Sequence, residues 1–232
     1  MKKTIQFALL LLAAFTFTFS SCKKDKKTPE NPSEPPPVAN EQEVVTTLRI
    51  YIWDSLGNPV AGSPFSFKDP DGDGGAPGAF LNNGADSLIT LSDSSRYSTR
   101  ILILDETKTP ADSVSNEVGG DESYEHMIFY NGDPANSANA KGNQVLTATY
   151  PDYKVKLNGS GITLRYTDTD NGVAHGQPAR NIGLTTELRT LAPTNGARHP
   201  FIITLRHQPD AKNGTYAPGE SDVEVMFKVR VN

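Results

Sequence analysis

Short segments of alternating apolar and polar residues dominate this chain and constrain its fold more than any other feature. The clearest such segment is residues 222–231. Its apolar residues occupy every second position, at Val223, Val225, Phe227, Val229 and Val231. Because successive side chains of a β-strand point to opposite faces, this spacing predicts a strand with one buried face. The other face holds Asp222, Glu224, Lys228 and Arg230 and is expected to lie in solvent.

Further strands are predicted where β-branched and aromatic residues cluster between turn-forming residues. They are residues 48–54, 65–68, 97–104, 124–130, 144–150, 162–166, 182–190 and 201–207. We expect an opening hairpin around Asn58-Pro59 and a second turn at Asn171-Gly172, before a strand at residues 182–188. Residues 107–118 are the only candidate for a helical turn. The pattern predicts an all-β protein, an Ig-like or transthyretin-like β-sandwich of about 8–10 antiparallel strands.

The amino terminus resembles an export signal. Lys2 and Lys3 precede an almost entirely apolar run at residues 7–19, and Ser20, Ser21 and Cys22 follow. The run is shorter than a typical transmembrane helix, so residues 1–21 are predicted to be a signal peptide. Small residues directly before a cysteine favour lipoprotein processing, with Cys22 acylated as the new amino terminus. The alternative is ordinary secretion with a free thiol.

Residues 22–42 are rich in proline and charge and show no apolar periodicity, which predicts a disordered tether after the lipidated Cys22. Residues 43–232 are then expected to form one β-sandwich domain. Cys22 is the only cysteine, so the fold cannot contain an intramolecular disulfide. We expect the protein to lie in the cell envelope, held by lipid at the outer membrane.

The charge of the chain argues against nucleic-acid binding. The formal net charge is −5, and residues 1–29 hold six lysines and one aspartate, so residues 30–232 carry −10. A domain of this charge repels phosphate backbones, whereas its acidic surface suits cations.

Residues 69–74 give the sharpest local motif. Asp69, Asp71 and Asp73 stand at alternate positions before Gly74, as in the first half of a calcium-binding loop. The twelfth position is Phe80 instead of the bidentate glutamate of an EF-hand. The alternatives are a β-loop calcium site completed by distant oxygens, or a tight acidic turn held by Asx-turns.

A second candidate site combines histidines with acids. His126 lies on the predicted strand at residues 124–130, on the face of Tyr124, Ile128 and Tyr130. His207 ends the face of Phe201, Ile203 and Leu205. With Glu122 and Glu125, the two imidazoles predict a site for zinc or another transition metal, provided that the fold brings them together. The alternative is a pair of hydrogen-bonded histidines at the edge of the core.

Catalytic motifs are missing from the sequence. It contains no G-x-S-x-G elbow, no phosphate loop and no dinucleotide fingerprint. The acidic residues Asp168 and Asp170 lie beside Asn171-Gly172 and are better interpreted as turn residues. We therefore expect a protein that is not an enzyme.

Several segments together resemble a family of small Bacteroidota envelope lipoproteins. They are residues 40–48 (NEQEVVTTL), 68–75 (KDPDGDGG), 121–126 (DESYEH), 205–210 (LRHQPD) and 219–225 (GESDVEV). The resemblance implies a lipoprotein working beside a TonB-dependent outer-membrane receptor, and it supplies no catalytic residue.

These observations favour a membrane-anchored, non-enzymatic binding module that assists a TonB-dependent receptor in capturing a ligand or metal ion. An alternative is a structural or adhesive Ig-like surface domain stabilised by calcium. A hydrolase with a metal or carboxylate site ranks last.

Overall fold

The computed structural model describes residues 42–72, 75–132, 155–157 and 159–232. They belong to the second of two units of the chain, Asn40–Asn232, whereas the first is Met1–Ala39. The described elements, in chain order, are β1 (Thr47–Asp54), β2 (Phe65–Lys68), β3 (Ala79–Phe80), η1 (Asn82–Ser87), β4 (Leu88–Leu91), β5 (Arg96–Leu104), α1 (Val114–Gly119), β6 (His126–Asn131), β7 (Val155–Leu157), β8 (Ile162–Tyr166), η2 (Gly172–His175), β9 (Thr185–Thr190), β10 (His199–His207) and β11 (Glu220–Val231).

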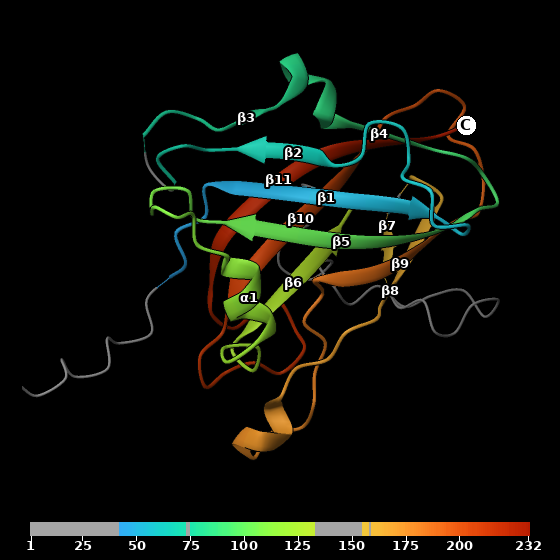
Figure 1. Ribbon diagram of the computed structural model, residues 1–232. Coiled ribbons are helices and arrows are strands. Elements are labelled where there is room, and N and C mark those ends of the chain that lie inside the picture. Colours follow the sequence, from blue (N-terminus) through green and yellow to red (C-terminus); the bar gives the residue numbers. More distant parts are fainter. Residues whose placement is uncertain (1–41, 73–74, 133–154, 158) are drawn as a thin grey trace, which may run out of the picture. The chain divides into compact units, whose positions relative to one another are not determined.

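The strands form two sheets. One has seven strands in the order β3-β2-β1-β5-β9-β8-β7, and the other has four in the order β4-β11-β10-β6. In Figure 1, β1, β2 and β5 run across the front of the view while β6, β10 and β11 cross behind them. The predicted all-β sandwich is confirmed. Pairing is antiparallel among the described strands except between β4 and β11, which are parallel.

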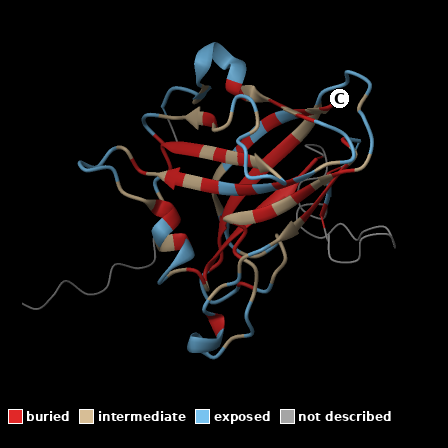
Figure 2. Cartoon of the chain, turned by 45° about the vertical axis from the view of Figure 1, so that its right-hand side comes forward, coloured by how far each residue is buried: buried red, intermediate tan, exposed pale blue. Residues whose placement is uncertain are grey.

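Alternation along the strands builds the core between the sheets. In β1 the buried positions are Leu48, Ile50 and Ile52, and in β11 they are Val225, Phe227, Val229 and Val231. Figure 2 shows the buried positions alternating with more exposed ones along β1 and β5. Full burial of a large apolar side chain stabilises the fold by about 1.5–3 kcal/mol, which explains why the register of these strands is fixed.

The helix α1 closes one end of the core. Val114 and Val118 are buried in the core cluster, and the Ser115 hydroxyl accepts a 2.6 Å hydrogen bond from the backbone N–H of Ile103 in β5. The predicted helical turn is thus confirmed at the end of its segment. Within the described residues, no helix is long and apolar enough to cross a membrane.

Two predicted hairpins are confirmed as neighbouring antiparallel pairs, β1 with β2 and β8 with β9. Asp54 organises the first turn, because its carboxylate accepts hydrogen bonds from the backbone N–H groups of Leu56 and Asn58, each 2.9 Å long. The connection between β8 and β9 is longer than a tight turn and contains η2, which starts after Asn171.

Several strand boundaries differ from the predictions. Residues 120–125 form turns, so Tyr124 lies outside β6, which starts at His126. The strand predicted from residue 182 starts at Thr185, because the Asp168 carboxylate accepts the backbone N–H groups of Gly183 and Thr185 at 2.8 Å each. The strand β4 was not predicted. The segment 144–150 lies outside the described residues.

Candidate metal centre

The fold brings the two predicted histidines together. His126 is the first residue of β6 and His207 the last of β10, and they are direct partners in the antiparallel pairing of these strands. Their rings stack with centroids 4.6 Å apart and planes 10° from parallel. His126 is 0% exposed and His207 4%. The juxtaposition on which the metal hypothesis depended is confirmed.

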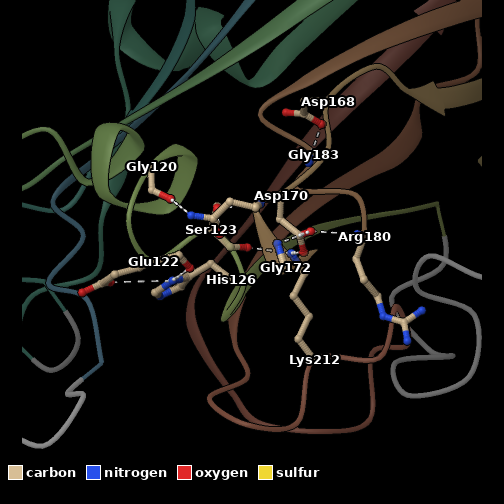
Figure 3. Close-up of polar contacts among 11 residues, drawn as sticks. Gly120, Glu122, Ser123, His126, Asp168, Asp170, Gly172, Arg180, Gly183 and Lys212 are labelled. Atoms are coloured by element: carbon tan, nitrogen blue, oxygen red, sulfur yellow. Dashed lines mark hydrogen bonds and ion pairs between the residues drawn. The ribbon is translucent and has the colours of Figure 1, made fainter. Parts of the chain in front are cut away.

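Glu122 lies on one side of the His126 ring. His126 Nδ1 is 3.2 Å from the backbone carbonyl oxygen of Glu122 and 3.8 Å from the carboxylate oxygen Oε2 of the same residue (Figure 3). This Oε2 atom is buried and has no hydrogen-bond partner. The turns that precede β6 therefore aim one carboxylate at the imidazole.

Glu43 completes a cluster that the sequence did not predict. It comes from the segment that leads into β1, far from Glu122 along the chain. One ligand atom from each of Glu43, Glu122 and His126 lies within 4.8 Å of the other two. Two carboxylates and one imidazole thus converge from the start of β1 and from the start of β6.

Asp222 lies on the other side of His126. Its Oδ2 atom is 3.7 Å from His126 Nε2, and its side chain is 0% exposed. Asp222 is skipped in the pairing of β10 with β11, because Leu205 pairs with Val223 and Arg206 with Ser221. Such a bulge locally redirects side chains. The prediction that Asp222 lies on a solvated strand face is therefore wrong.

The cluster holds two partly buried carboxylates close together beside one fully buried imidazole. Burial, the neighbouring Glu122 carboxylate and Glu117 raise the pKa of Glu43 to about 8. Burial raises the pKa of Asp222 to about 7. Burial and the positive form of His207 lower the pKa of His126 to about 4, so the imidazole is neutral and able to act as a ligand.

The other two predicted ligands form a separate pair. Glu125 Oε2 lies 3.9 Å from His207 Nε2, and neither residue belongs to the Glu43 cluster. The predicted set of His126, His207, Glu122 and Glu125 around one ion is therefore only partly assembled. Glu43 joins Glu122 and His126 instead, whereas Asp222 lies on the other side of the ring, and no local sequence pattern distinguishes these two acids from surface acids.

A buried lysine supports the turn that carries Glu122. Lys212 donates 2.7 Å hydrogen bonds to the Ser123 carbonyl oxygen and to Asp170 Oδ2, and its side chain is 1% exposed (Figure 3). The Ser123 hydroxyl also bonds to the Asn171 side chain at 2.9 Å. Asp170 thus has a structural role, in agreement with its interpretation as a turn residue.

The donor set fits a divalent transition metal ion. Zinc and manganese accept imidazole nitrogen together with carboxylate oxygen, and three protein ligands leave a position for water or an exchanging ligand. Histidine ligands commonly donate their other ring N–H to a carboxylate, which orients the ring. Asp222 is placed to accept such a bond from His126 Nε2.

Only part of the predicted calcium site lies within the described residues. Asp69 and Asp71 are described, whereas Asp73 lies outside the described residues. Burial and the Asp71 carboxylate raise the pKa of Asp69. Asp71 Oδ2 accepts a 2.9 Å bond from the backbone N–H of Ala76, five residues on, whereas an Asx-turn joins the side chain to the N–H two residues on. Calcium binding here stays a prediction.

Cys22, the predicted lipidation site, also lies outside the described residues. Comparison with protein-family models, with curated proteins and with solved structures gives no match to this chain.

Proposed function

We propose that this protein is a lipid-anchored, non-enzymatic binding module of the cell envelope that captures a divalent transition metal ion, zinc foremost. Glu43, Glu122 and His126 Nδ1 are assigned as ligands, and Asp222 as the residue that orients His126. This assignment requires the imidazole proton on Nε2, and the metal ion would replace the contact of Nδ1 with the Glu122 carbonyl oxygen. The observation that supports this most directly is the set of buried polar atoms without hydrogen-bond partners around one imidazole. They are Glu122 Oε2, His126 Nε2 and both carboxylate oxygens of Asp222.

Such a cluster is unfavourable for stability by itself. A buried polar group without a partner costs about 1–3 kcal/mol, and more if it is charged. Carboxylates that share a desolvated site also repel one another, which agrees with the raised pKa of Glu43 and of Asp222. A divalent cation would supply the missing partner to Glu122 Oε2 and would offset the repulsion between the Glu43 and Glu122 carboxylates. A bound cation would therefore account for a fold that retains these two carboxylates beside one imidazole.

Capture is favoured over catalysis because the sequence offers no nucleophile–base pair or known catalytic motif. Lipidation of Cys22 and the proline-rich tether at residues 22–42 would keep the module near the membrane. A TonB-dependent outer-membrane receptor is the partner that we propose for the captured ion, on the basis of the sequence resemblance.

Zinc binding can be tested on the chain that starts at residue 22, with Cys22→Ser to prevent acylation. After removal of metal by a chelator, calorimetry and elemental mass spectrometry should find one zinc ion per chain. Glu122→Gln and His126→Gln should each weaken binding by at least about tenfold, because each removes one of three ligands. His175→Gln is the matched control, since His175 is exposed and lies in η2.

Absence of stoichiometric zinc after equilibration would contradict the metal assignment, as would equal affinity in the Glu122→Gln variant. The receptor assignment has a separate test, which is affinity capture from detergent-solubilised membranes. Repeated failure to recover an outer-membrane receptor would count against the partner without affecting the metal site.

A further inference from the structure

The outward face of the seven-stranded sheet is strongly basic, although the protein as a whole is acidic. Residues 42–232 contain 16 lysines and arginines against 23 aspartates and glutamates. The strand register places seven basic residues on the face that points away from the core. They are Arg49, Lys68, Arg96, Arg100, Lys156, Arg165 and Arg189. Among the described strand residues on this face, Glu187 is the only acid, and Glu106, directly after β5, forms ion pairs with Arg49 and Lys68.

Basic residues face one another directly across neighbouring strands. Arg96 of β5 is paired with Arg189 of β9, and the same row continues through Thr163 of β8 to Lys156 of β7. Like charges directly opposite each other destabilise a sheet. The Glu187 carboxylate offsets part of this repulsion through ion pairs with Arg96 at 3.1 Å and Arg165 at 2.7 Å. Among the described strand residues of this face, basic side chains outnumber acidic ones.

Two aromatic side chains lie beside this row. Tyr51 and Trp53 of β1 are half-buried, and their rings are stacked with centroids 5.8 Å apart. Arg100 is the direct partner of Tyr51 across β1 and β5, and within the described part of the chain it forms no ion pair. Side chains of Arg49 and Arg96 are 32% and 53% exposed. Arginine beside tyrosine and tryptophan is the combination found at membrane interfaces, where aromatic rings lie among the headgroups.

We infer that this face binds the anionic phospholipid headgroups of the membrane to which the chain is anchored. The charge separation gives the domain one orientation, because the basic sheet face is attracted to the bilayer while the acidic remainder is repelled. A nucleic acid is less favoured, because the proposed anchor at Cys22 holds the domain near a bilayer, and only there does proximity offset the overall negative charge of the domain.

The predicted tether would keep the domain close to the bilayer. Residue 42, where the predicted tether ends, is five residues before β1, and β1 is the strand that holds Arg49, Tyr51 and Trp53. If Cys22 is acylated as proposed, the tether raises the effective concentration of this face at the bilayer, so that weak attraction is sufficient. The inference uses the proposed anchor only for this proximity. The metal centre uses other residues.

The test is co-sedimentation of the Cys22→Ser chain with vesicles of phosphatidylcholine alone or mixed with phosphatidylglycerol. We expect binding only to the mixed vesicles and its loss at high salt. Each basic residue near an anionic surface contributes about fivefold in affinity, so Arg49→Gln/Arg100→Gln/Arg189→Gln should weaken binding by about 100-fold. Lys228→Gln/Arg230→Gln removes two positive charges from β11 of the other sheet; it is the control and should retain at least about a tenth of the affinity. Zinc binding, measured on the same samples, should be unchanged in both variants.

The inference fails if the chain does not bind mixed vesicles, or if the triple variant binds as well as the unchanged chain. An equal loss in the control variant would show that only net charge matters, which also overturns it. Salt-sensitive self-association through this face, without vesicle binding, would assign the surface to a second copy of the chain instead. Thermal melting of each variant verifies that the fold is intact.

Discussion

Replacement of Asp222 by asparagine measures two effects of this carboxylate separately, the folding stability that its burial costs and its contribution to zinc affinity. The Asp222 side chain is fully buried, and neither carboxylate oxygen has a hydrogen-bond partner. Asparagine keeps the shape, removes the charge and can accept a hydrogen bond from His126 Nε2. We therefore expect the metal-free Asp222→Asn variant to be more stable than the unchanged chain at alkaline pH.

The magnitude follows from the pKa of the buried carboxyl. Burial raises this pKa from 3.8 to about 7, and one unit corresponds to about 1.36 kcal/mol, so full ionisation costs about 4 kcal/mol of stability. Because the folded state holds the proton more tightly than the unfolded state, this stability is present below pH 4 and is lost as pH rises through 7. Between pH 5 and pH 8 the loss should be about 2–3 kcal/mol.

The assay is urea unfolding of the metal-free Cys22→Ser chain at pH 5 and pH 8, with a chelator present. The change in unfolding free energy between the two pH values should be about 2–3 kcal/mol smaller in Asp222→Asn than in the unchanged chain. Glu224→Gln removes the same charge at an exposed position of the same strand and serves as control. Zinc affinity should fall by about 10–100-fold in Asp222→Asn, since the residue that orients His126 is altered.

An identical pH dependence in Asp222→Asn and the unchanged chain would refute the reasoning, because it would mean that Asp222 is ionised in the fold at no cost. A variant that gains stability but binds zinc with unchanged affinity would refute only the orienting role of Asp222.

Two further predictions concern the residues that hold the centre in place. Lys212→Met should lower the unfolding free energy, measured in urea, by about 3–5 kcal/mol, because it leaves the buried Asp170 carboxylate without its cation. The double variant Lys212→Met/Asp170→Asn should regain part of this loss, and equal instability of the two variants would contradict the ion-pair explanation. Gly219→Ala should destabilise the fold by more than about 1 kcal/mol and weaken zinc binding, because Gly219 has φ +76° and a Cβ there would lie 1.9 Å from the His207 carbonyl oxygen. If the thermal melt and the zinc titration equal those of the unchanged chain, the backbone adapts and the prediction is wrong.

The sequence by itself determined the fold class and most strand positions. A strand repeats every two residues, so the alternation in β1 and β11 is visible in the sequence itself, and the turn residues between strands mark their ends. It also predicted His126 and His207 as one pair, because each continues an apolar strand face. Their proximity depends on the neighbouring positions of β6 and β10, which no local pattern specifies.

The tertiary structure alone decided which acids surround His126. Glu43 reaches it because β1 starts beside the turn before β6, and Asp222 reaches it because a bulge shifts the register of β11 on β10. Both are contacts between segments distant in sequence, whereas propensity and periodicity report only on neighbours along the chain. The same limit explains the basic sheet face, since its arginines come from separate strands and are gathered by their order and register in the seven-stranded sheet.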